Sequence, residues 1–203
     1  MEIQCECGTF RAELTGFPKN TPGRFFCYCD DCQTYMHFLD RADLMDEAGG
    51  CEIVPVYPSE MKFTQGSESL KCVRLSPKGL YRWTTTCCKT PILNTSPGMP
   101  WLGVASRVYT VKDPTFLQRT LGEVRCRIEG RFARGTPPPG TSEKATFKDF
   151  LKLIPFLLKG VIKRKGRNSP FFKSDGKTPI VTPYVLTIEE RNAIRTRLGF
   201  QKK

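Results

Sequence analysis

The chain has 203 residues, which suits one domain or one domain with a long tail. Hydrophobic residues make up 39% and charged residues 26%, so a core can form and wholesale disorder is excluded. No apolar run approaches the roughly 20 residues that span a bilayer. The polar, acidic start also lacks the pattern of a secretory signal peptide. We therefore expect a cytoplasmic protein with reduced cysteines.

The charge is divided unevenly along the chain. Residues 1–100 contain 10 Lys/Arg and 12 Asp/Glu, whereas residues 101–203 contain 22 and 8. The formal net charge of +12 therefore comes from the second half. A strongly basic segment of this kind is typical of a surface that binds an anionic partner. Nucleic acid and an anionic membrane surface are both candidates. A solvated basic face is the alternative.

Alternating apolar residues and turn signals predict strands in the first part of the chain. The expected strands cover residues 2–13 with a turn at Gly8, then 24–29, 53–57, 70–75, 79–86 and 101–111. Pro55 favours an edge position or a connection for the third of these, because proline cannot donate to a ladder. A short helix is expected over 40–48, stopped by Gly49 and Gly50.

The second part of the chain has helical signals. Residues 134–142 are rich in proline and glycine and predict a linker. Residues 146–165 have the spacing of an amphipathic helix, in which Pro155 predicts a kink or break. Thr187 and Glu190 form a capping-box pattern for a last helix that ends near Leu198 and Gly199. We expect a mainly β domain over 1–133 and a basic helical extension over 134–203, packed on the domain or tethered to it.

The chain has ten cysteines and one histidine. Seven cysteines fall into clusters, namely Cys5 and Cys7, then Cys27, Cys29 and Cys32, then Cys87 and Cys88. Clusters of reduced thiols indicate metal ligands, and sulfur ligands select zinc or an iron–sulfur cluster. The remaining three, Cys51, Cys72 and Cys126, are expected to be small packing residues on strands. His37 is either a fourth ligand or acid–base group, or a partly buried surface residue.

The spacing suggests how the clusters meet. Cys5 and Cys7 point to one face of a strand but cannot close a site by themselves. Cys88, with Cys87 as a further candidate, can complete that site from a distant strand if the strand ends in a turn there. Cys27, Cys29 and Cys32 form a claw of three thiolates, across a turn expected at Asp30 and Asp31, without an obvious fourth ligand.

The number of metal sites stays open at this point. Two separate sites, or one site with spare cysteines, both fit the spacing, so we expect one or two Zn²⁺ ions per chain. Asp30, Asp31 and His37 are candidate helpers of chemistry at the three-cysteine site, although the two aspartates are also ordinary turn formers.

With these motifs, the chain resembles the glutathione-dependent formaldehyde-activating enzymes and the centromere protein V-like proteins. The resemblance covers about residues 1–115 and lies in four segments: Cys5–Glu6–Cys7–Gly8, the run from Cys27 to Cys32, residues 66–81, and residues 82–91 with Cys88 and Pro91. It implies a β-tent fold, a structural zinc held by Cys5, Cys7 and Cys88, and a second zinc held by Cys27, Cys29 and Cys32. In that family's proposed chemistry, the second zinc meets the thiol of glutathione or its formaldehyde adduct.

The chain also departs from the family pattern. Thr85 stands where the family has the first cysteine of its late pair, and Lys89 replaces a glycine. The segment from Gln33 to Met36 is bulkier than the family's small residues.

Two functions follow as hypotheses. The first is a carbon–sulfur lyase-like zinc enzyme that acts on a thiol adduct such as a glutathione conjugate, with Arg24 or Arg82 as candidates to hold a carboxylate. The second is a non-catalytic, zinc-stabilised binding module that uses the basic half to contact an anionic partner.

Overall fold

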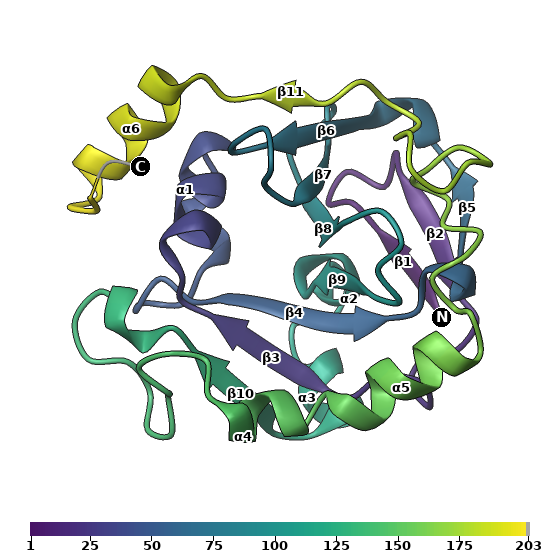
Figure 1. The fold of residues 1–203 in the computed structure, drawn as a ribbon, viewed down its shortest axis with the longest axis horizontal. Coiled ribbons are helices and arrows are strands. Elements are labelled where there is room, and N and C mark those ends of the chain that lie inside the picture. Colours follow the sequence, from purple (N-terminus) through teal and green to yellow (C-terminus); the bar gives the residue numbers. More distant parts are fainter. Residues whose placement is uncertain (202–203) are drawn as a thin grey trace.

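The computed structural model describes residues 1–201 and is mainly β, with two sheets and short helices between and around them (Figure 1). The smaller sheet is antiparallel and consists of β1 (Glu2–Gln4), β2 (Arg11–Leu14) and β5 (Met61–Gln65). The larger sheet has the spatial order β10 (Val124–Ile128), β3 (Arg24–Cys27), β4 (Cys51–Val56), β9 (Leu102–Ala105), β8 (Pro91–Thr95), β7 (Tyr81–Thr85), β6 (Leu70–Arg74) and β11 (Tyr184–Val185). Its two outermost pairs, β10 with β3 and β11 with β6, are parallel, and the other pairs are antiparallel.

The helices are α1 (Asp30–Phe38), α2 (Arg107–Thr110), α3 (Phe116–Leu121), α4 (Phe147–Leu151), α5 (Ile154–Ile162) and α6 (Ile188–Arg197). Helices α4 and α5 run along the side of the molecule where β3, β4 and β10 lie, and α1 and α6 lie together at another corner (Figure 1). The main core lies between the two sheets around Trp83, Phe10 and Phe171, all fully buried. Among residues 1–201, no helix has both the length and the apolar character needed to cross a bilayer.

Several expected elements are present. Gly8 has a φ of +75° and turns the chain between β1 and β2, as its place in the sequence predicted. The strands expected over 70–75 and 79–86 are β6 and β7. The capping box of α6 is complete, because the Thr187 hydroxyl accepts from the Glu190 N–H and the Glu190 carboxylate accepts from the Thr187 N–H.

Strand β4, which contains Pro55, is an interior strand of the larger sheet and neither an edge strand nor a connection, although Pro55 itself lies where the β3 side is unpaired. Strand β4 lies between β3 and β9, and Pro55 pairs with Gly103 of β9. The register with β3 covers only Cys51 to Ile53, so the end of β4 that contains Pro55 has a strand neighbour on one side. A proline is tolerated there because no ladder partner needs its missing N–H.

The strand expected over residues 101–111 is much shorter than predicted, since β9 has only four residues, Leu102–Ala105. After β9 ends at Ala105, the chain forms α2, which buries both Val108 and Tyr109 in the main core. Two consecutive residues cannot face one side of a strand, so burying both requires the helical turn.

The helix expected over 40–48 is also wrong, since only a short 3₁₀ turn, η1 (Ala42–Leu44), forms there. The helix precedes it instead. Cys29 caps the N-terminus of α1 by accepting the Cys32 N–H, and Asp30 and Asp31 lie in the first turn, where the helix dipole favours negative charge. Asp40, with a φ of +60°, separates α1 from η1. The turn expected at Asp30 and Asp31 is therefore the start of a helix.

The long helix expected over 146–165 is divided into α4 and α5. The break falls at residues 152–153 rather than at Pro155, which lies in the first turn of α5. Proline fits this position because the first N–H groups of a helix have no partner within it.

Candidate metal centres

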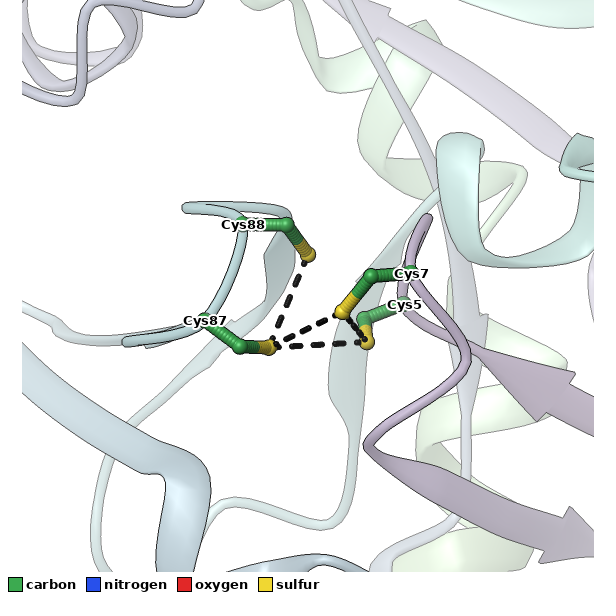
Figure 2. Close-up of side chains that lie close together, drawn as sticks. All are labelled: Cys5, Cys7, Cys87 and Cys88. Atoms are coloured by element: carbon green, nitrogen blue, oxygen red, sulfur yellow. Dashed lines mark hydrogen bonds between the residues drawn. The ribbon is translucent and has the colours of Figure 1, made fainter.

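The fold brings four cysteines together, Cys5, Cys7, Cys87 and Cys88, which we call the first cysteine group. The hairpin turn after β1 supplies the first pair and the turn after β7 supplies the second, and their sulfur atoms lie within 4.8 Å of one another. Figure 2 shows the four sulfurs facing a common centre. Residues 86–88 form a turn directly after β7 ends at Thr85, which lets both adjacent cysteines reach the same side.

The spacing of these sulfurs suits one tetrahedral ion. Ligands about 2.3 Å from a zinc ion lie about 3.8 Å from one another in a tetrahedron. The Sγ–Sγ distances are 3.5 Å for Cys5–Cys7, 3.9 Å for Cys5–Cys87, 3.2 Å for Cys7–Cys87 and 3.7 Å for Cys87–Cys88 (Figure 2). The donor set and its geometry therefore fit a closed four-thiolate site.

Neighbouring polar groups surround the first cysteine group. The Phe10 N–H donates to the Cys5 sulfur over 3.3 Å, and the hydroxyls of Thr9 and Thr90 lie 3.2 Å from Cys7 and 3.1 Å from Cys88. Burial alone would raise the pKa of Cys88, but hydrogen bonds with Thr85 and Thr90 lower it to about 5. Such contacts orient thiolates and stabilise their charge, as in metal sites.

Cys27, Cys29 and Cys32 form a second cysteine group at the junction of β3 and α1, again with sulfurs within 4.8 Å of one another. Hydrogen bonds with the Cys27 and Cys29 thiols hold the pKa of Cys32 well below its ordinary value. The buried Arg82 on β7 places its Nη1 atom 3.8 Å from the Cys32 sulfur. Three thiolates with a divalent cation would carry one negative charge, which this guanidinium offsets.

Sequence reasoning missed the position of Cys51. It lies directly opposite Cys27 in the pairing of β4 with β3, and its thiol hydrogen-bonds to Cys32. Its sulfur nevertheless does not belong to the set of three sulfurs that all lie within 4.8 Å of one another. Only the strand register reveals this neighbour, because 24 residues separate Cys51 from Cys27 in the sequence. The other two packing cysteines, Cys72 and Cys126, are buried as expected.

The remaining candidates have structural partners. His37 contacts Arg134, with 2.6 Å between Nε2 and Nη2, and belongs to neither cysteine group within residues 1–201. Asp30 is buried and forms an ion pair with Arg195 of α6 over 2.6 Å. Arg24 pairs with Glu52 of the neighbouring strand over 2.5 Å. Of the two arginines expected near a substrate, only Arg82 lies beside a cysteine group.

A pocket opens beside the second cysteine group. It is lined by Cys32, Cys51, Arg82, Asn94, Gly103 and Arg107, together with apolar residues that include Tyr35, Met36, Ile53 and Leu93. The Oδ1 atom of Asn94 is buried and has no hydrogen-bond partner within the described chain. A side chain at Gly103 would fill the same space, because its Cβ would lie 2.7 Å from that oxygen. The pocket is therefore lined by a cationic side chain (Arg82), a thiol (Cys32) and a hydrogen-bond acceptor without a partner in the described chain (Asn94 Oδ1).

Comparison with known proteins places the chain in a family. No protein with a curated description matches it. A crystal structure of a Rhodobacter sphaeroides protein is similar, with 20% identity and a TM-score of 0.41, covering 61% of this chain and 97% of that one. The model of a family of unknown function, DUF6151, matches residues 1–182. The chain belongs to the DUF6151 family.

Proposed function

We propose that this protein is a two-site zinc protein whose second site acts on a thiol adduct as a carbon–sulfur lyase. The observation that carries the proposal is the contrast between the groups: four sulfurs close the first, whereas three converge in the second beside a pocket. Closed four-cysteine sites are structural, and three protein ligands leave a position for a substrate. The proposal includes a β-tent arrangement of the two sheets and kinship with the formaldehyde-activating enzymes.

The residues around the second cysteine group suit an anionic thiol compound. A zinc ion bound there would supply Lewis acidity and a position for a soft sulfur ligand. Arg82 lies within reach of both Cys32 and the pocket, where its buried guanidinium attracts a carboxylate or a developing negative charge. Asn94 offers its unpaired oxygen to a donor on the substrate.

Metal analysis of variants tests this assignment. We expect two zinc ions per chain in the unaltered protein and one in Cys29→Ser, purified under reducing conditions. Cys126→Ser is the matched control, because Cys126 lies outside both groups and a serine hydroxyl can still donate to Asp149 as the thiol does over 3.2 Å. Turnover of thiol adducts should be lost in Cys29→Ser and kept in Cys126→Ser. A single zinc that survives Cys29→Ser would contradict the second site.

A second candidate function is attachment to an anionic membrane surface through α4 and α5. Phe147, Leu151, Leu158 and Ile162 are each at least 46% exposed. Residues 147–167 contain seven Lys/Arg and a single acidic residue, Asp149. Exposed apolar side chains flanked by cations are typical of helices that lie in a membrane interface.

Vesicle sedimentation tests this second function. The protein should sediment with phosphatidylserine-containing vesicles and lose that binding in Ile162→Ser. Ile188→Ser is the control, since Ile188 is also exposed but lies on α6. Absence of binding to anionic vesicles would refute the attachment.

A further inference from the structure

An apolar hollow lies between the larger sheet and the helices α4 and α5. Its cavity volume is about 550 Å³, within the size range of small-molecule sites. Residues of β3 and β4 line one side, residues 99–101 another, and side chains of α4 and α5 the third, where Phe150 and Val161 are also partly exposed to solvent. The lining includes Phe25, Cys27, Ile53, Trp101, Phe156 and Leu157. Among residues 1–201, no charged side chain lines it.

Helix α5 is anchored beside this hollow. The Phe156 ring stacks on Tyr57 with centroids 4.2 Å apart and planes 8° apart, and the Tyr57 hydroxyl donates to the Phe156 carbonyl over 2.7 Å. Gly160 allows the close approach, because a Cβ there would lie 2.9 Å from Tyr57 and 3.0 Å from Pro100. These contacts hold α5 at a fixed distance from the sheet, so the hollow is part of the packed structure.

The hollow adjoins the second cysteine group. Cys27 lines the hollow, and Cys32 of the same group lines the polar pocket with Arg82. Ile53 lines both spaces. Phe25 pairs with Ile53 and Cys27 with Cys51 across β3 and β4, so these four side chains share one face of the sheet. The second cysteine group therefore lies between a cationic pocket and an apolar one.

We infer that the hollow binds the hydrocarbon part of the substrate, which makes the substrate class a thiol or thiol conjugate with an aliphatic or aromatic group. This inference rests on the proposed function, because it takes the second cysteine group as the place where the thiol binds. A substrate with such a group would place its sulfur at the cysteines, its polar part toward Arg82 and its apolar part under α5.

Cobalt-substituted protein tests the inference with a spectroscopic readout. Titration with n-alkanethiols from ethanethiol to octanethiol should change the sulfur-to-cobalt charge-transfer bands of the second site. Each buried methylene should tighten binding about fourfold until the hollow is filled. An affinity that is independent of chain length would overturn the inference.

Two neighbouring leucines provide matched variants. Leu157 lines the hollow and Leu158, on the outer side of α5, is 56% exposed. Leu157→Trp should remove the gain from octanethiol while leaving ethanethiol binding unchanged, and Leu158→Trp should change neither. Leu157→Phe, a smaller increase in volume, should give an intermediate loss and serves if the tryptophan variant does not fold. Equal behaviour of the Leu157 and Leu158 variants would overturn the inference.

The neutral dye Nile red separates this inference from the proposed function. If no thiol alters the cobalt spectrum, the proposed thiol site fails. Nile red binding that is lost in Leu157→Trp and kept in Leu158→Trp would then still establish an apolar binding site in the hollow. If the dye binds neither the unaltered protein nor the Leu158 variant, the apolar site fails as well.

Discussion

Replacing Arg195 with alanine should strongly destabilise the protein. Its side chain is 1% exposed, and its guanidinium contacts Asp30 over 2.6 Å and Asp31 over 3.5 Å. Its Nε atom also donates to the Gln201 carbonyl over 2.7 Å. These contacts join α6 to the first turn of α1, between Cys29 and Cys32. Arg195 therefore stabilises both the C-terminal helix and the start of the second cysteine group.

The magnitude follows from what Arg195→Ala leaves behind. Breaking a buried ion pair by removing one partner costs roughly 3–5 kcal/mol, because the other charge stays desolvated. Asp30 keeps a hydrogen bond from the Asp31 N–H over 2.8 Å, so we expect the lower end, about 3 kcal/mol. This loss is large against a typical free energy of unfolding of about 5–15 kcal/mol.

Urea unfolding measures this loss in metal-free, reduced protein. Arg197→Ala is the matched control, since Arg197 lies in the same last turn of α6 but is exposed, and its effect should stay within about 0.5 kcal/mol. Arg195→Ala should also weaken metal binding by the second cysteine group more than by the first. A change in unfolding free energy below about 1 kcal/mol for Arg195→Ala would refute the reasoning.

Four further predictions concern a helix cap, the reactivity and titration of a thiol, and packing. Thr187→Ala removes the capping box of α6 and should lower the unfolding free energy by about 1 kcal/mol, whereas the exposed Thr196→Ala on the same helix should have little effect. In metal-free protein, Cys88, with its pKa of about 5, should react with iodoacetamide at pH 7 before Cys5, whose pKa burial raises to about 12. Because the Cys88 pKa is lowered in the folded state, its contribution to stability is present above the ordinary thiol pKa and should be lost as the pH falls toward 5, which urea titrations at several pH values will show. Gly160→Ala should lower the melting temperature, although alanine favours helices by about 1 kcal/mol, because the added Cβ would contact two rings within 3.0 Å.

Local signals predicted much of the fold. The alternation of β6, the turn at Gly8 and the capping box of α6 depend on neighbouring residues, so a sequence pattern contains them. The sequence pattern did not predict helix α1, because its N-cap is Cys29, and a cysteine in a cluster is more readily taken for a metal ligand than for a helix start. The interior place of β4 was not predicted, because tolerance of its Pro55 depends on how far the neighbouring strand β3 extends. That extent is set by tertiary pairing.

The candidate site shows the same division. The seven clustered cysteines could be grouped from spacing, and the structure brings them together as two groups. Arg82 and Cys51 contact Cys32 of the second group from β7 and β4, and Asn94 of β8 lines the pocket beside it. Strand order, which no local motif encodes, decides their proximity. The sequence therefore could not predict which polar residues line the pocket, although it offered Arg82 as a candidate to hold a carboxylate.

The two cysteine groups are joined through Glu6, the residue between Cys5 and Cys7. Its carboxylate pairs with Arg41 over 2.7 Å and with Arg107 over 2.5 Å, and these contacts lower its pKa against the opposing effect of burial. Arg41 follows α1 and also donates to the Cys88 carbonyl over 3.3 Å, while Arg107 lines the pocket beside Cys32. An ion in the first group would fix the backbone around Glu6 and, through these arginines, one wall of the pocket. The structural site would thus support the shape of the second.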